Sequence, residues 1–519
     1  MGSRWSRFRQ NRNRRNMEID SDSEVEQSSS DGAEDESPSL AVFLALMLRS
    51  GQVRLVRSDE SNLHDDDSNA SETEEIANCC PKSSAGCTGN TSLKGDLWHD
   101  FSFVRNNALS SGTENQKQKF FQPHNLAMAL RQRESNICGF ARGNFTPGIC
   151  TSISSRFIPN HISHRLTYHE KMFCGTYSRD GSLFLSACQD RHIRVFNTQN
   201  GLHSQPFKVI RAKDVGWSVL DTAFSPDSRY AAYSSWSSYI HLCTVHDGDD
   251  PRIAQHLALD LRPNHHSFAV FSLKFSSDSE EIICGANDGY LYVYNLDQSE
   301  RTLHIDAHED DINAVCFADK SSQILFSGGD DGLVKVWDRR TFSENNATPA
   351  GIFAGHRDGI TFIDSKGDAR YLLSNSKDQS IKLWDMRNFS SESAVDSVRR
   401  IVSNQSWDYR WQNVPRALRR HKRAVDGDTS VQTYTGHKVM NTLIRARFSP
   451  VHTTGNRYIY SGCSSGRVFV YDLLTGKVET KHKMHKHCVR DVHWHPYEHQ
   501  MMSSSWDGTI AEWEWKAEQ

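Results

Sequence analysis

The sequence has no apolar run long enough to cross a membrane. The longest, residues 40–48, is about half the length that a spanning helix needs, and no apolar signal segment opens the chain. The cysteines are scattered, and no further ligand at zinc spacing completes the trio Cys79, Cys80 and Cys87. We therefore expect a soluble protein with reduced thiols, located in the nucleus and cytoplasm, that binds no metal.

Neither sign of charge dominates the chain. Its 60 basic and 64 acidic residues leave a net charge of −4, which gives no global field favouring nucleic acid or an anionic membrane. Charge is segregated only locally: residues 1–17 carry six arginines, and residues 18–37 switch to serine, aspartate and glutamate. We expect no direct nucleic-acid binding and look for partners in local features.

A hairpin signal lies at residues 324–340, where two alternating apolar runs flank Asp331-Gly332. Trp337 follows Asp331 by six residues, and Ser327 precedes Asp331 by four. The same spacing leads from Ser186 to Phe196, from Ser374 to Trp384 and from Ser503 to Trp513, while degenerate copies end at Cys243, Tyr294 and Tyr471. The sequence therefore contains seven repeated units.

The seven units end at residues 196, 243, 294, 337, 384, 471 and 513, with spacings of 47, 51, 43, 47, 87 and 42 residues. A period of about 40–45 residues with a Trp-Asp signature resembles the blade of a WD-repeat propeller. The resemblance predicts an all-β, seven-bladed WD-repeat β-propeller over residues 146–519. The last unit stops soon after Trp515 without an outer strand, so we expect a strand at 149–158 to complete it and close the ring.

The polar positions of three units predict buried networks. A buried indole N–H needs an acceptor, and a chain through Ser, His and Asp supplies one while fixing the turn. We assign this structural role to three tetrads: His308, Ser327, Asp331 and Trp337; His356, Ser374, Asp378 and Trp384; and His485, Ser503, Asp507 and Trp513.

These tetrads also argue against an enzyme. A hydrolase triad would need a nucleophile on an exposed elbow, and no G-x-S-x-G motif is present. The histidines at 482, 485, 487, 493 and 495 fall on a loop and strand that the repeat already explains. We expect no catalytic residue, no cofactor and no metal.

The part of the chain before the propeller divides by composition. Residues 1–37 predict a disordered basic and then acidic tail, and residues 58–118 a disordered linker. Residues 38–57 predict an amphipathic helix, and residues 119–145 a second short helix, at 123–133, with a lead-in. The apolar face of the first helix consists of Leu40, Phe43, Leu44, Met47 and Leu48.

The amino terminus leaves two alternatives open. The arginine cluster fits a nuclear-import signal as well as a solvated tail. Gly2 with Ser6 also fits the pattern for myristoylation, which with the arginines would anchor the chain to a membrane.

The long interval between units five and six predicts an insertion at about 388–434. It contains Trp407-Asp-Tyr-Arg410, Trp411 and a basic run at 416–423. Residue 401 is isoleucine where a repeat would have its turn acid, so Trp407 copies the repeat signature in letters only. The aromatic and arginine residues either anchor an interface or pack against the side of the propeller.

Two consecutive units place an arginine two residues after their Trp-Asp pair, at Trp337-Asp338-Arg339-Arg340 and Trp384-Asp385-Met386-Arg387. This paired WDxR element resembles the signature of WD-repeat substrate receptors of cullin-four RING ubiquitin ligases. The helix at 38–51 resembles the one that such receptors insert into their adaptor. Residues 215–221, 268–272, 364–370 and 407–411 are similar to one branch of that family, and the acidic tail and residues 58–118 depart from it.

The resemblance implies a non-catalytic substrate-recognition subunit. Its partners would be the damaged-DNA-binding adaptor protein with the cullin-four ligase core, and a protein substrate. Adaptor binding would fall to Asp338, Arg340, Asp385 and Arg387 together with the apolar face of the 38–57 helix. Two alternatives remain: a general WD-repeat scaffold, whose arginines form ion pairs between blades, and an acylated scaffold at a membrane.

Overall fold

A computed structural model describes residues 130, 131, 134 and 154–517, except 200–204, 247–254, 263–267, 342–346 and 421–423. Leu130 and Arg131, which belong to the predicted second helix at 123–133, are helical, and so is Glu134 just beyond its predicted end. The predicted segments 1–37, 38–57 and 58–118, including the apolar face from Leu40 to Leu48, lie outside the described residues.

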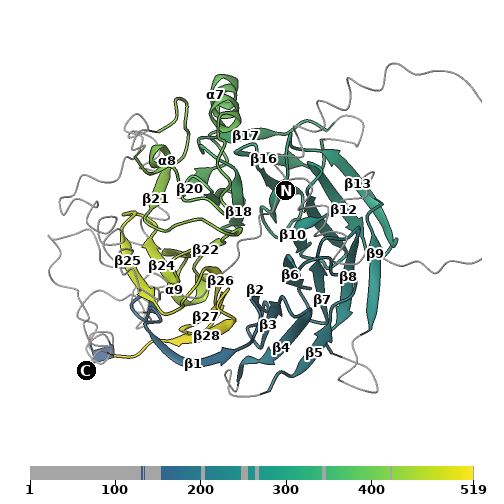
Figure 1. Ribbon diagram of the computed structural model, residues 1–519, viewed down its shortest axis with the longest axis vertical. Helices are drawn as coiled ribbons and strands as arrows, with labels where there is room; N and C mark the ends of the chain where they lie inside the picture. The colour runs from purple at the N-terminus through teal and green to yellow at the C-terminus, as the bar shows by residue number, and fades with distance from the viewer. Residues whose placement is uncertain are drawn as a thin grey trace, which may run out of the picture. The chain divides into compact units, whose positions relative to one another are not determined.

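Seven four-stranded antiparallel sheets form a ring of blades around a central axis (Figure 1). The predicted seven-bladed propeller is therefore confirmed. The blades contain, in order from the axis outward, β2 (Met172–Tyr177), β3 (Leu183–Cys188), β4 (His192–Asn197) and β5 (Lys208–Arg211); β6 (Asp221–Phe224), β7 (Tyr230–Ser234), β8 (Tyr239–Thr244) and β9 (His256–Asp260); β10 (Val270–Phe275), β11 (Glu281–Ala286), β12 (Tyr290–Asn295) and β13 (Glu300–Asp306); β14 (Ile312–Phe317), β15 (Ile324–Gly329), β16 (Leu333–Asp338) and β17 (Gly351–Ala354); β18 (Ile360–Ser365), β19 (Tyr371–Ser376), β20 (Ser380–Asp385) and β21 (Gln432–Thr435); β22 (Ala446–Phe448), β23 (Tyr458–Gly462), β24 (Arg467–Asp472) and β25 (Val478–Lys483); and β26 (Val489–Trp494), β27 (Gln500–Ser505), β28 (Thr509–Glu514) and β1 (His161–Thr167).

The ring has two faces, which we name by their connections. The hairpin face carries the turns between the second and third strands of each blade, such as 330–332 and 377–379. The Arg face carries the residues that follow the third strands, such as 339–341 and 386–388. In the hairpin turn of blade four, Gly332 has a φ of +76°, a conformation that suits glycine because it has no Cβ.

The ring is closed by β1, which pairs antiparallel to β28 with Ile162 opposite Trp513 and Leu166 opposite Ile510. An amino-terminal strand thus does complete the last blade, but the prediction of its position at 149–158 is wrong. Residue 154 is helical and residues 157–160 are not in a strand. The strand lies later because Ile158 and Ile162 pack into the core between blades six and seven.

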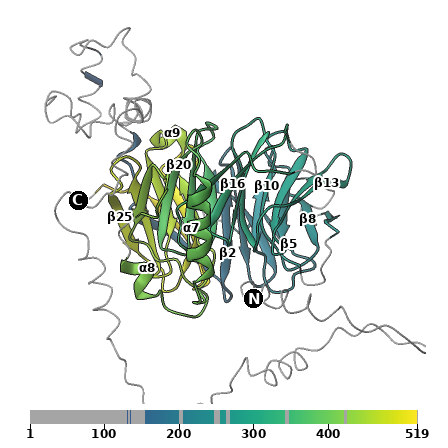
Figure 2. The ribbon, with the colours of Figure 1, turned by 90° about the horizontal axis from the view of Figure 1, so that it is seen from above.

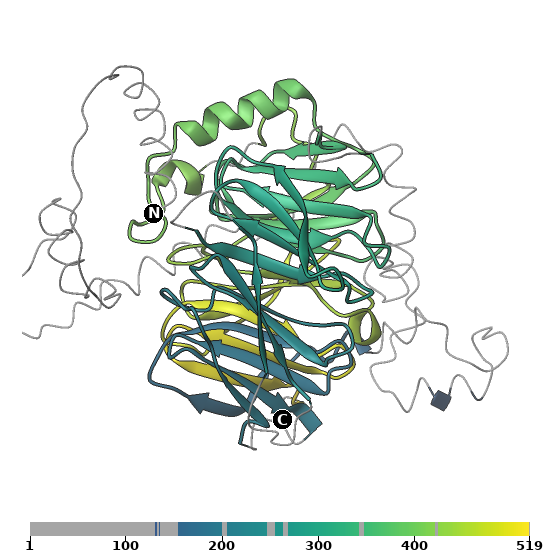
Figure 3. The same ribbon diagram turned by 90° about the vertical axis from the view of Figure 1, so that its right-hand side faces the viewer.

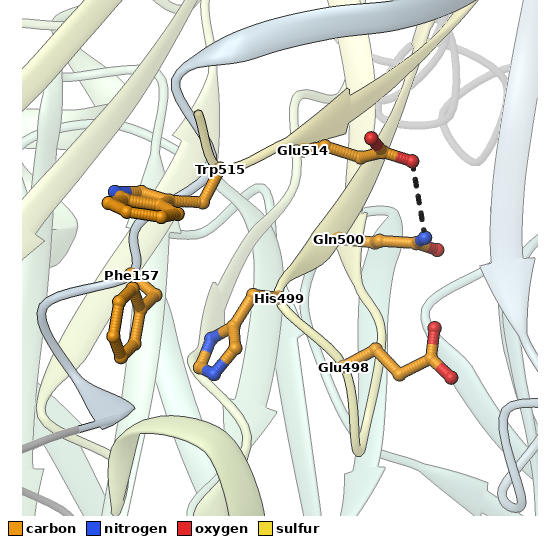
Figure 4. A pocket seen from close by; sticks show the side chains of 6 residues that line it. All are labelled: Phe157, Glu498, His499, Gln500, Glu514 and Trp515. Atoms are coloured by element: carbon orange, nitrogen blue, oxygen red, sulfur yellow. Dashed lines mark hydrogen bonds between the residues drawn. The ribbon is translucent and has the colours of Figure 1, made fainter. Parts of the chain in front are cut away.

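The segment before β1 is held by aromatic packing on the Arg face of blade seven. Phe157 lies 4.8 Å from Trp515 and 5.2 Å from His499, measured between ring centroids. These rings border a shallow pocket of ≈ 390 Å³, and Figure 4 shows Glu514 bonded to Gln500 beside them, with both side chains turned away from the rings. Because these aromatic side chains pack against one another, we interpret the pocket as part of the contact that closes the propeller.

Large apolar side chains fill the space between neighbouring blades. The cluster between blades four and five includes Val334, Val336, Ile360, Ile363 and Trp384, all at most 1% exposed. Burial of each such side chain stabilises the fold by about 1.5–3 kcal/mol. Sheet-to-sheet packing of this kind holds each blade at a fixed angle to the next.

A buried ionic network joins the innermost strands around the axis. Asp491 on β26 accepts hydrogen bonds from Arg445 at 2.9 Å, from Arg447 at 2.5 Å and from the Gly175 backbone N–H at 3.2 Å. Arg445 also donates to Asp221 on β6 at 2.6 Å. These residues lie on blades one, two, six and seven, so the network spans the point at which the ring closes.

The predicted insertion leaves blade five after β20 and returns at β21. Its helix α7 (Glu392–Ser403) lies on the outside of blade four, roughly parallel to the axis of the ring (Figures 2 and 3), and buries Ala394, Val395 and Val398 there. Residues 432–434, predicted to belong to the insertion, form the start of β21. Two short helices, α8 (Arg416–Arg420) and α9 (Val451–Thr454), lie toward opposite faces of the ring in Figure 2.

Candidate functional site on the two faces of the propeller

The tetrads of blades four and five have the same geometry. The His308 imidazole contacts Asp331 at 2.9 Å and Ser327 at 2.7 Å, and the Trp337 indole N–H donates to the Ser327 hydroxyl at 2.9 Å. In blade five, His356 contacts Asp378 at 3.0 Å and Ser374 at 2.7 Å. The Trp384 indole N–H donates to the Ser374 hydroxyl at 2.7 Å. Each tetrad links the hairpin turn to the loop before the blade.

Burial and charge oppose each other at the turn aspartates. Burial alone would raise the pKa of Asp331 and of Asp378, but the neighbouring histidine in each tetrad holds it below its usual value. The serines at 327 and 374 are fully buried and already engaged. A hydroxyl with no access to a substrate cannot serve as a nucleophile, so these groups are structural.

In blade seven a fifth residue, Thr509, takes part in the buried network beside the predicted tetrad, and the sequence analysis missed it. His485 contacts Ser503 at 2.7 Å and Thr509 at 2.8 Å, whereas its nearest approach to Asp507 is 3.5 Å. Thr509 donates to Asp507 and thereby links the histidine to the aspartate. The Thr two residues after the turn Asp was the available signal, because Ser380 occupies the same place in blade five.

The remaining histidines of the 482–495 stretch have separate surroundings. The Tyr177 backbone N–H donates to His493 at 3.4 Å, and His495 contacts the Gly181 carbonyl at 3.0 Å. Within the described ranges, no group of three or more His, Cys, Asp or Glu side chains is arranged to hold a metal ion. No helix among these residues is long and apolar enough to cross a membrane.

On the Arg face, both WDxR elements form the same closed turn. The Arg340 backbone N–H, Nε and one Nη donate to the Asp338 carboxylate at 3.1, 2.9 and 2.7 Å. Arg387 contacts Asp385 in the same way at 3.0, 3.2 and 2.9 Å. The hydrogen bonds from Arg340 lower the pKa of Asp338 to about 2, so this carboxylate is charged at neutral pH.

The two guanidinium groups remain open to solvent, at 65% exposure for the Arg340 side chain and 49% for that of Arg387. Arg339, the residue between Asp338 and Arg340, makes an ion pair between blades, since it holds Glu281 of blade three at 2.5 and 2.8 Å. Arg340 and Arg387 therefore lie on consecutive blades as fixed, exposed cations.

On the hairpin face, the insertion places Trp407 and Tyr409 over blades four and five. The Trp407 indole N–H donates to Asp358 at 2.7 Å, and Lys377 lies 4.2 Å from the centre of the Tyr409 ring. Arg410 binds Asp408 through Nε and one Nη at 2.9 and 2.6 Å, which repeats the WDxR turn outside any blade. The motif letters at 407–410 thus encode the same local turn on the opposite face.

The repeated hairpins and their buried tetrads define the class: a seven-bladed WD-repeat propeller protein. The WD domain, G-beta repeat family matches five segments, at 161–197, 260–295, 299–338, 347–385 and 476–514. The first of them begins at β1, the strand that closes the ring.

The chain is 42% identical over 381 residues to the "DDB1- and CUL4-associated factor 11 homolog" of Caenorhabditis elegans, covering 72% of this chain and 66% of that protein, just under two thirds of its length. It is 42% identical over 404 residues to the "LEC14B protein" of Lithospermum erythrorhizon, which covers 76% of this chain and 83% of that protein. The "LEC14B homolog" of Prunus armeniaca is 39% identical, over 74% of this chain and 80% of that protein. The chain belongs to the WD-repeat family that contains these proteins.

Proposed function

We propose that the chain is a non-catalytic substrate-recognition subunit of a cullin-four RING ubiquitin ligase. The observation that carries the proposal is the pair of exposed guanidinium groups, Arg340 and Arg387, held in identical turns on consecutive blades of one face. Because each guanidinium is held by its own aspartate, its orientation is set before a partner binds, which lowers the entropic cost of a contact with that partner. The name of the nematode relative supports this choice of partner.

In this proposal the damaged-DNA-binding adaptor docks on the Arg face, through Arg340 and Arg387. The helix predicted at 38–57 adds an apolar contact in a separate groove of the adaptor. A protein substrate binds on the hairpin face and the insertion. The gain in ubiquitin transfer is one of proximity, and the complex acts in nucleus and cytoplasm.

The test is the double variant Arg340→Ala with Arg387→Ala, assayed by recovery of adaptor and cullin on the full-length chain. Thermal stability should stay within about ±0.5 kcal/mol, because both side chains are exposed. Adaptor affinity should fall by about 30-fold or more, the equivalent of the ~2–5 kcal/mol that such contacts contribute across an interface.

Arg229→Ala is the matched control. Arg229 also pairs with an aspartate two residues earlier on the Arg face, at 3.7 Å, but it belongs to blade two. It should leave adaptor recovery unchanged. If the double variant folds normally and recovers adaptor at the wild-type level, docking through the WDxR turns is wrong. If the wild-type chain recovers neither protein, the general scaffold is the better description, and the mass of the amino terminus decides whether Gly2 is acylated.

A further inference from the structure

The insertion displays an ordered tryptophan that the fold does not use. The Trp411 side chain is 85% exposed. Its backbone is nevertheless fixed, because the Trp411 and Gln412 N–H groups donate to the Asp408 carbonyl at 3.1 and 2.8 Å. The Gln412 side chain accepts from the Asp408 N–H at 2.9 Å and closes the turn from its other side.

The residues on either side of this turn are anchored to the hairpin face. Besides the Trp407 bond to Asp358, the Asn441 N–H donates to the Tyr409 carbonyl at 2.8 Å. Tyr409 therefore holds the turn from beneath while Trp411 points to solvent. An indole in a turn held by this many contacts is pre-organised, which lowers the entropic cost of binding through it. Tryptophan and arginine are the residue types most enriched where interfaces concentrate their energy.

The stretch of sequence that contains Trp411 is basic. Between residues 397 and 424 the sequence carries seven arginines and a lysine against one acid, Asp408, although the whole chain has a net charge of −4. Arg416 is exposed, and the Arg410 side chain is 33% exposed. Arg410 uses Nε and one Nη on Asp408, and a guanidinium has further donors to offer.

The same surroundings favour a protein over a nucleic acid. A phosphate backbone is bound by several cations in a row. Here Asp408 offsets Arg410, Arg399 is paired with Glu309 at 3.1 Å, and the aspartates at 330 and 358 lie under the insertion. A tryptophan that has Arg410 as its neighbour and the exposed Arg416 five residues further along matches a peptide in which single carboxylates flank an apolar side chain.

We propose that Trp411, with Arg410 and Arg416, forms a docking site for an acidic segment of a protein partner that carries a large apolar residue among its carboxylates. The site rests on the proposed function, where such a segment would be the recognition element of the substrate. It lies on the hairpin face, away from Arg340 and Arg387, so it can be occupied while the Arg face holds another protein.

The experiment selects a displayed library of random 12-residue peptides on the full-length chain. Enriched peptides should combine several Asp or Glu with a large apolar residue. A synthetic copy should lose at least tenfold in affinity for Trp411→Ala and for Arg416→Glu, and its binding should weaken as salt is raised. Tyr497→Ala, which removes a 53% exposed aromatic residue from the Arg face, should bind as wild type does. Unchanged melting temperatures keep unfolding out of the comparison.

Enrichment of neutral or basic peptides, equal binding to the Trp411→Ala variant, or no enrichment at all would overturn the proposal. Trp411-dependent binding of a 12-nucleotide oligothymidine would also overturn it, in favour of a nucleic-acid surface. Adaptor recovery, measured in parallel, keeps the two proposals apart. If the wild-type chain does not recover the adaptor, the ligase function is refuted and the peptide result is unaffected. If adaptor recovery is normal but peptide binding does not depend on Trp411, only the docking site is refuted.

Discussion

The charge network at the propeller axis leads to a sharp prediction for Asp491→Ala. Asp491 is fully buried and accepts from Arg445, Arg447 and the Gly175 N–H. Burial by itself would raise the pKa of Asp491, but Arg447 and Arg445 hold it well below the usual range. The carboxylate therefore stays charged even below the pKa of a free aspartate, and its contribution to stability, complete above that pKa, is lost progressively as the pH falls from about 4 into strong acid.

Removal of this carboxylate leaves two buried guanidinium groups with incomplete pairing. Arg445 keeps Asp221 at 2.6 Å, and Arg447 keeps only the Val492 carbonyl, at 2.6 Å. Loss of one partner from a buried pair costs about 3–5 kcal/mol. With an unfolding entropy of ~2.1 cal/mol/K per residue over residues 154–517, this corresponds to a fall in melting temperature of about 4–7 °C.

Scanning calorimetry of the full chain measures this fall. Asp426→Ala, an exposed aspartate of the insertion, is the control and should melt as wild type does. Asp491→Ala combined with Arg447→Met should recover part of the loss, because the orphaned charge is then replaced by an apolar side chain of similar length. A single variant that melts at the wild-type temperature, or a double variant whose losses simply add, would refute the view that the network is coupled by charge.

Three further predictions follow from the blades. Asp378→Ala should lower stability by about 1–3 kcal/mol in a thermal melt, since it leaves buried donors from His356 and Ser380 unpaired; an unchanged melt would contradict the tetrad. A chain that starts at Met172 lacks β1 and exposes the edge of β28, so gel filtration should show oligomers or aggregate, and a stable monomer would contradict the closure. Burial raises the pKa of Asp358 to about 6, so its charged form opposes folding as pH rises from about 4 through 6; Asp358→Asn should therefore raise the melting temperature, relative to wild type, more at pH 7.5 than at pH 5, and an equal difference at both would refute this.

Much of the propeller could be predicted from the sequence because its information is local. The Ser, Asp and Trp of a blade lie within ten residues on one hairpin, so a fixed spacing encodes their meeting. The degenerate units could be counted for the same reason, although their turns are held differently. In the degenerate unit of blade three, the Tyr292 hydroxyl donates to the turn residue Asp288.

The candidate sites were less visible. The sequence identified both WDxR turns directly. The structure adds that Arg339, which lies between Asp338 and Arg340, makes a contact between blades. The face on which Trp411 lies could not be read, because it depends on where α7 packs against blade four. Thr509 went unnoticed for a similar reason, since it matters only where His485 lies too far from Asp507 for a direct hydrogen bond.

The sequence by itself determined the number of blades, their hairpins, the Ser, Asp and Trp of each tetrad and the two WDxR turns, since each is a matter of spacing along one strand pair. Tertiary structure alone decided which amino-terminal strand closes the ring and how charges meet at the axis. Arg445 and Asp221 are 224 residues apart, and Gly175 and Asp491 are 316 apart. Partners at that separation are chosen by the curvature of the whole ring, which brings the first strand of every blade to a common axis.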